Sequence, residues 1–202
     1  MGGALIDEHT YTGVPGLFAA GESAGGVHGA SRLAGNGSSD VIVFGGIAGK
    51  AAAGTRLDIA GRPWQRIHDQ AMQALRRTQG RAGTLRPEAV VLAVRKIMLE
   101  AAGLYRNEGS LARGAAQLEE LQHRMDDDLA VGDPGDSLRA LEASNMILVG
   151  RMIIAAARER RESRGAHQRT DFTASDDANW LRHTAVRKAG AGNIELTTVP
   201  IR

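Results

Sequence analysis

Residues 16–40 read GLFAAGESAGGVHGASRLAGNGSSD, and this stretch decides how the rest of the sequence is interpreted. An apolar run ends at the single acid Glu22, and glycines then recur at short intervals as far as Gly37. The chain becomes apolar again over residues 41–49, VIVFGGIAG. This order predicts a strand, a glycine-rich loop and the start of a buried helix. Because glycines let a backbone approach a ligand closely and a helix N-terminus presents unpaired N–H groups, it predicts a site for a flat or phosphorylated ligand.

The composition is that of a globular chain with an aliphatic core. Its 202 residues are 43% hydrophobic but only 3% aromatic, and they include no cysteine, which excludes disulfides and thiolate metal sites. The net charge of +2 is small and the basic residues are dispersed, so we predict no nucleic-acid partner. No apolar run reaches the ~20 residues of a membrane span, and we predict no transmembrane segment. No signal peptide or metal signature is visible, which favours a cytoplasmic protein without a resident metal.

Helical patterns follow the glycine-rich stretch. The apolar residues predict a buried helix over residues 38–55, capped by Ser38, Ser39 or Asp40. A second, amphipathic helix is predicted from Pro63 to Arg77. Its apolar residues are predicted to face the core, and they are Trp64, Ile67, Met72 and Leu75.

The second half of the sequence predicts a three-helix bundle. One helix begins at Pro87 and ends between Gly103 and Arg106, and two more cover residues 110–125 and 136–162. The last of these is apolar on every side in its middle, so we predict a fully buried central helix. Alternation over residues 193–199 predicts a terminal strand.

The stretch that opens this section resembles the second flavin-contacting segment of the succinate dehydrogenase/fumarate reductase flavoprotein family, of which L-aspartate oxidase is a close relative. The family carries GLYAAGE, then GGVHGANRLGGNSLLD and VVFGRIAG. This chain carries GLFAAGE, GGVHGASRLAGNGSSD and VIVFGGIAG in the same order. Three later segments resemble motifs of the same family, namely LYRNE at 104–108, ESRGAH at 162–167 and DDANWLRHT at 176–184. Two separate groups of motifs in the family's order make chance similarity a poor explanation.

The resemblance implies an α+β, mostly α fold in three parts. Residues 1–56 would be the C-terminal remnant of an FAD-binding α/β domain, residues 57–84 a linker with a helix, and residues 85–202 a C-terminal helical bundle domain with a terminal strand. The family's G-x-G-x-x-G turn and its capping domain have no counterpart here. We therefore expect a C-terminal fragment, engineered or naturally truncated at an internal Met, that is inactive in isolation.

Arg32 is the principal candidate for binding a substrate. A planar guanidinium can hold a carboxylate through two hydrogen bonds, and the resemblance assigns Arg32 to a carboxylate of the dicarboxylate substrate beside the flavin. The resemblance places His28 near the same substrate, where it positions the loop or contacts the ligand. No catalytic residue is assigned within this chain, because the family's proton-donating Arg belongs to the capping domain.

Four positions are candidates for binding the cofactor. The resemblance assigns Glu22 to the ribityl and phosphate region of the flavin. It assigns Asn36, Gly37 and Ser38 to the segment that contacts the isoalloxazine ring through the backbone and the helix N-terminus. A positive helix end there favours an anionic reduced flavin.

The resemblance thus implies part of an FAD-dependent oxidoreductase that interconverts succinate and fumarate by hydride transfer, with FAD bound in the complete protein. Two alternatives remain open: a fragment of L-aspartate oxidase, and a non-catalytic helical module for docking or oligomerisation. The expected partners are a dicarboxylate, an iron–sulfur subunit and a second copy of the chain. Partner subunits would hold the cytoplasmic protein at the inner face of the membrane.

Overall fold

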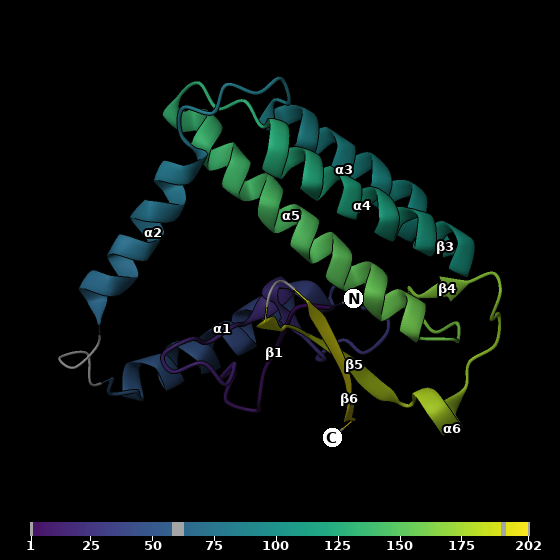
Figure 1. Cartoon of the computed structure of the whole chain (residues 1–202). Coiled ribbons are helices and arrows are strands. Elements are labelled where there is room, and N and C mark those ends of the chain that lie inside the picture. The colour runs from purple at the N-terminus through teal and green to yellow at the C-terminus, as the bar shows by residue number, and fades with distance from the viewer. Residues whose placement is uncertain (1, 58–62, 191–192, 202) are drawn as a thin grey trace. The chain divides into compact units, whose positions relative to one another are not determined.

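The structure is a computed structural model that describes residues 2–57, 63–190 and 193–201 (Figure 1). It is mostly helical, as the sequence predicts, and the chain divides into two compact units. Residues 1–62 and 164–166 are called the N-terminal unit, and residues 63–163 and 167–202 are called the bundle unit. The three-part division at residues 56 and 84 stays a prediction.

The bundle unit is built on three helices that pack against one another (Figure 1). They are α3 (Pro87–Ala102), α4 (Glu108–Asp128) and α5 (Pro134–Glu159), which confirms the predicted three-helix bundle. The point at which each helix begins is explained by residues at its N-terminus. Pro87 occupies the first helical position of α3, where its missing N–H costs nothing. The side chains of Asn107 and Asp133 accept hydrogen bonds from the first turns of α4 and α5.

The hydrophobic core lies between these helices. Gly114 of α4 faces both neighbours, and a Cβ at this position would overlap the Cβ of Ala101 and lie 3.1 Å from Cδ1 of Ile154. The close approach of the helices therefore requires glycine here. The buried apolar residues are Val90, Val94, Ala101, Leu111, Leu118, Leu121, Met125, Leu129, Val131, Ala140, Ala143, Ile147, Ile154 and Ala157.

Helix α5 is buried along one face only. The prediction of burial on every face is wrong for the described chain, since Leu138 is 60% and Val149 is 53% exposed. In a bundle of three helices each member turns one side away from its partners, whatever its composition. By length and composition alone α5 also meets the criteria for a membrane-spanning helix. Its packing against α3 and α4 is the arrangement typical of a core helix.

The remaining elements of the bundle unit are shorter. Helix α2 (Trp64–Thr78) forms where predicted, but none of its residues is buried, so the predicted core role of Trp64, Ile67, Met72 and Leu75 is wrong within the described chain. Strands β3 (Tyr105–Arg106) and β4 (Gln168–Arg169) pair in parallel. Helix α6 (Asp177–Trp180) precedes an antiparallel hairpin of β5 (Arg182–Lys188) and β6 (Ile194–Pro200), which confirms the terminal strand.

The N-terminal unit contains little regular structure besides one helix. Strand β1 (Ala4–Leu5) pairs in parallel with β2 (Ala24–Gly25), and residues Gly21–Ser23 form the 3-10 turn η1. The predicted strand over residues 16–22 is wrong, because only Phe18 bridges to Tyr11. Positive φ angles at both ends of that segment interrupt an extended backbone.

Helix α1 (Asn36–Gly54) follows the glycine-rich loop. It starts directly after Gly35, whose φ of 86° ends the loop, and no side chain caps it. The predicted cap at Ser38, Ser39 or Asp40 is therefore wrong, because the helix begins before these residues. Asp40 is the only residue of α1 that is buried in the described chain, so the predicted burial of the whole helix is also wrong here.

Candidate functional site

The candidate site lies in the N-terminal unit, where the loop of residues 26–35 meets the first turn of α1. The loop is anchored at Ala30, whose carbonyl accepts a hydrogen bond of 3.0 Å from the N–H of Ala166. The turn η1 adjoins the same helix, since a Cβ at Gly21 would lie 2.8 Å from Cγ1 of Val41. Two of the predicted ligand-binding segments therefore converge on α1.

The Arg32 side chain lies against the start of α1. A Cβ at Gly37 would lie 2.8 Å from Nη1 of Arg32 and 3.2 Å from its Cζ. Arg32 is otherwise exposed and forms no ion pair with a described residue. The structure thus brings one predicted substrate-binding residue beside one predicted cofactor-binding residue, and it leaves the guanidinium open to a ligand.

The first turn of α1 carries a free backbone donor. The N–H of Asn36 donates to the Leu33 carbonyl and that of Ser38 to the Gly35 carbonyl. No described residue accepts a hydrogen bond from the N–H of Gly37. Because the helix dipole places positive charge at this end, the turn suits an electron-rich ligand atom.

Three predicted cofactor residues have open surroundings. Glu22 is exposed in η1, and the side chains of Asn36 and Ser38 are exposed on α1. No described hydrogen bond joins Glu22 to the other predicted site residues. An exposed carboxylate beside α1 can accept a hydrogen bond from a ligand hydroxyl. The open N–H and the exposed carboxylate are groups of the kinds that the electron-rich ring atoms and the hydroxyl groups of a flavin would need.

His28 has a partner that sequence reasoning missed. Its Nε2 lies 2.9 Å from Oδ2 of Asp40, and the two side chains are 16% and 4% exposed. The other oxygen, Oδ1, is buried and has no hydrogen-bond partner in the described chain. The sequence shows only that Asp40 is an acid placed directly before the apolar run of residues 41–49, and this does not identify His28 as its partner.

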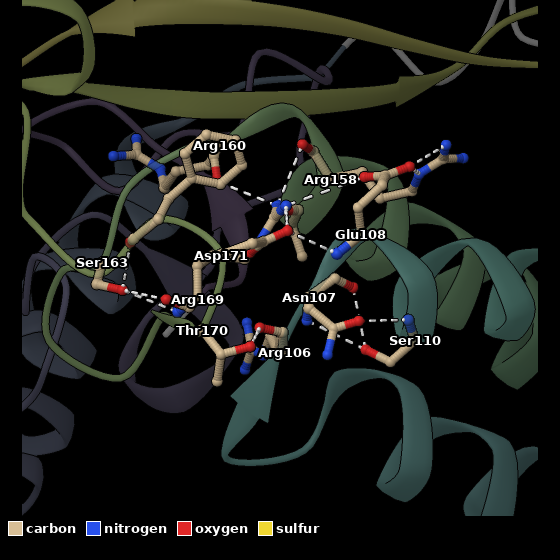
Figure 2. Close-up of polar contacts among 12 residues, drawn as sticks. Arg106, Asn107, Glu108, Ser110, Arg158, Arg160, Ser163, Arg169, Thr170 and Asp171 are labelled. Carbon is tan, nitrogen blue, oxygen red and sulfur yellow. Dashed lines mark hydrogen bonds and ion pairs between the residues drawn. The ribbon is translucent and has the colours of Figure 1, made fainter.

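A second polar cluster lies in the bundle unit, where the start of α4 and the end of α5 meet Ser163 and residues 167–172 (Figure 2). The Arg169 side chain is 1% exposed and donates from Nε and Nη2 to the two oxygens of Asp171, at 2.7 and 2.8 Å. Its Nη1 donates to the carbonyl of Ala157 at 2.7 Å. The hydrogen bonds from Arg169 hold the pKa of the Asp171 carboxyl well below its usual range. All three donor nitrogens of the guanidinium are used, so the cluster closes the end of α5 and offers no ligand site.

His167 belongs to the same region and is held at both ring nitrogens. Its Nδ1 accepts from Nη1 of Arg106, and its Nε2 donates to the carbonyl of Arg160, each at 3.1 Å. Arginine can only donate and a carbonyl can only accept, so these partners fix the neutral tautomer. Burial lowers the pKa of the imidazole, and the nearby Arg106 and Arg160 cations lower it further.

Other candidate sites are weak. Within the described residues, no group of three or more His, Asp and Glu side chains could hold a metal ion. Two small hollows of about 190 and 170 Å³ lie in the bundle unit. Neither contains a residue predicted to bind ligand, so the loop of residues 26–35 remains the site with the most suitable chemistry.

Comparison with known proteins identifies the family of the chain. The family described as fumarate reductase flavoprotein C-term matches residues 92–202, and an FAD binding domain matches residues 1–38. A fumarate reductase flavoprotein subunit from Haemophilus influenzae is 34% identical and aligns with 100% of this chain and 35% of its own length. An L-aspartate oxidase from Streptomyces coelicolor is 38% identical over 92% of this chain and 32% of its own length.

The chain is also similar to a solved structure. The FrdA chain of an E. coli quinol fumarate reductase mutant matches with a TM-score of 0.85 and 30% identity, over 98% of this chain and 36% of that one. The chain thus spans about a third of the length of the curated relatives it matches, 35% of the H. influenzae protein and 32% of the S. coelicolor protein.

Proposed function

The chain belongs to the fumarate reductase and succinate dehydrogenase flavoprotein family, and on that premise we propose that it supplies part of the flavin and dicarboxylate site of an FAD-dependent oxidoreductase. The observation that carries the proposal is the position of Arg32. Its guanidinium lies beside Gly37 at the start of α1 and has no acidic partner among the described residues. A substrate carboxylate and a cofactor edge would therefore meet at this point.

Each proposed residue has a definite task at this site. Arg32 would hold a carboxylate of the substrate through two charge-assisted hydrogen bonds. The free N–H of Gly37 and the dipole of α1 would stabilise negative charge on the cofactor, with Asn36 and Ser38 beside it. Glu22 would accept a hydrogen bond from a cofactor hydroxyl. FAD, when bound, supplies the group that accepts or gives the hydride. His28 would act near the substrate.

Amino-acid oxidation is a second candidate within the same class. The S. coelicolor L-aspartate oxidase shares 38% identity with the chain. Aspartate and succinate are both dicarboxylates, so Arg32 would serve either substrate. Turnover of aspartate by the complete protein would select this alternative, and turnover of succinate or fumarate alone would exclude it.

The bundle unit also offers a surface for a partner. The exposed apolar side of α5, which includes Leu138 and Val149, supports docking of another subunit or a second copy of the chain. An iron–sulfur subunit, attachment to the inner face of a membrane through partner subunits, and oligomerisation are proposed on the family membership. Light scattering of the purified chain, alone and with candidate subunits, tests subunit docking and oligomerisation.

The decisive test of the dicarboxylate site is Arg32→Ala in the complete holoenzyme. Loss of a bidentate charged pair removes about 3 kcal/mol of binding, which corresponds to about a hundredfold loss of kcat/KM. We expect that loss with the flavin absorbance band retained. Arg76→Ala is the matched control, because Arg76 is exposed on α2 and forms no ion pair with a described residue. Turnover of Arg32→Ala near that of the control would overturn the assignment.

A further inference from the structure

We propose that Asp40 and His28 form a positioning pair that fixes the loop carrying Arg32 against α1, so that Arg32 is held ready for a substrate carboxylate. The proposal rests on the proposed function for the identity of the ligand. The pairing itself rests on the geometry of the N-terminal unit. In this pair, Asp40 holds His28 in place. His28 acts on the substrate indirectly, by positioning Arg32.

The contact has the properties of a structural anchor. The Asp40 side chain is 4% exposed and the His28 side chain is 16% exposed, with 2.9 Å between Nε2 and Oδ2. A carboxylate taken out of water is stable only where a donor replaces the lost solvation. Removing His28 would leave Asp40 without its donor from the loop, so the contact favours one arrangement of loop and helix.

Arg32 lies between fixed points. The chain is held at His28 by Asp40 and at Ala30 by the N–H of Ala166, and it enters α1 at Gly35. The exposed Arg32 is thus confined to a short span anchored on both sides. A shift of the His28 anchor would move Arg32 away from Gly37, which its guanidinium now adjoins.

The two ring nitrogens of His28 allow a positioning role to be distinguished from direct binding of the substrate. Nε2 is engaged by Asp40, whereas no described residue forms a hydrogen bond with Nδ1. A direct ligand would use Nδ1, and a positioning residue needs only Nε2. Glutamine places an amide N–H near the Nε2 position, and asparagine places one near the Nδ1 position. The two substitutions therefore test the nitrogens one at a time.

The first experiment compares His28→Gln, His28→Asn and His28→Ala in the complete holoenzyme. For a positioning pair, we expect His28→Gln to keep the KM for dicarboxylate within about threefold of wild type, and the other two to raise it about tenfold at retained flavin content. Asp40→Asn, which keeps an acceptor oxygen, should resemble His28→Gln. The reverse order, with asparagine tolerated and glutamine not, would make His28 a direct ligand and overturn the proposal.

A second experiment needs no turnover. In the 202-residue chain, Asp40→Ala should accelerate amide hydrogen exchange in residues 28–36 and leave the core of the bundle unit unchanged. Asp7→Ala is the matched control, because its carboxylate accepts from the N–H groups of His9 and Tyr11 and should affect only that turn. Unchanged exchange in residues 28–36 of Asp40→Ala would refute the pairing. If the complete protein turned over no dicarboxylate while this exchange result held, the proposed function would fail and the pairing would stand.

Discussion

The two units of this chain are stabilised in different ways. In the described part of the bundle unit, fourteen apolar side chains are buried in a core formed by α3, α4, α5 and the loop that joins α4 to α5. In the described part of the N-terminal unit the buried residues are Thr10, Gly21 and Asp40, and none of them is a large apolar residue. Its apolar side chains face outward, as Leu33 and Ile42 do at 74% exposure each. The bundle unit is therefore stabilised by hydrophobic burial, whereas the described part of the N-terminal unit depends on turns and polar contacts.

The largest effect should come from matched truncations in the two units. Ile147 is fully buried in α5, so Ile147→Ala should lower the free energy of unfolding by about 2–5 kcal/mol. Ile42 of α1 is 74% exposed, so Ile42→Ala should change it by less than about 0.5 kcal/mol. Urea unfolding followed by circular dichroism measures both. Equal losses would mean that the N-terminal unit has a hydrophobic core after all.

Glycine-to-alanine substitutions sharpen the comparison, because they should change stability in opposite directions in the two units. Gly114→Ala would force the new Cβ into Ala101 and should destabilise the bundle unit by about 1–3 kcal/mol. A Cβ at Gly45 of α1 would meet no heavy atom within 4 Å. Because alanine favours a helix by about 1 kcal/mol over glycine, Gly45→Ala should stabilise α1. Residue-resolved hydrogen exchange reports each unit separately, and a loss of protection in α1 would contradict this expectation.

Acid should produce the smallest of these effects, and we expect it to act through His167 of the bundle unit. Because burial lowers the pKa of His167 in the folded chain, the unfolded chain binds a proton first. The stabilisation is therefore complete above about pH 6.5 and is lost as the pH falls through the lower value of the folded state. Urea midpoints at pH 7.5 and 5.5 measure the loss. His167→Gln should reduce this dependence on pH, and an unchanged dependence would show that other groups cause it.

The bundle could be predicted from the sequence because its signals are local. Pro87 marks the start of α3, and apolar residues spaced three or four apart mark the buried faces of all three helices. Asn107 and Asp133 are capping residues of the preferred types. Such signals act within one turn of helix and do not require knowledge of distant residues.

The candidate site could be predicted in part only. The motif led to Arg32 and Gly37, which the structure places side by side. The partnership of Asp40 with His28 was missed because it joins a loop to the interior of a helix, and no local pattern encodes such a pair. Helix α1 was predicted to be buried because its residues are apolar on all sides. The composition of a helix shows which kind of surface it can pack against. It does not show whether the described chain contains such a surface.

The parallel pairing of β3 with β4 joins segments that are far apart along the chain. Arg106 and His167, which meet beside this pairing, are 61 residues apart in sequence. Closing so long a loop costs chain entropy that the short α3–α4 and α4–α5 connections do not. We expect the helices to assemble first and residues 167–172 to dock onto them last. Weakening this late contact should therefore accelerate unfolding while leaving the rate of folding nearly unchanged.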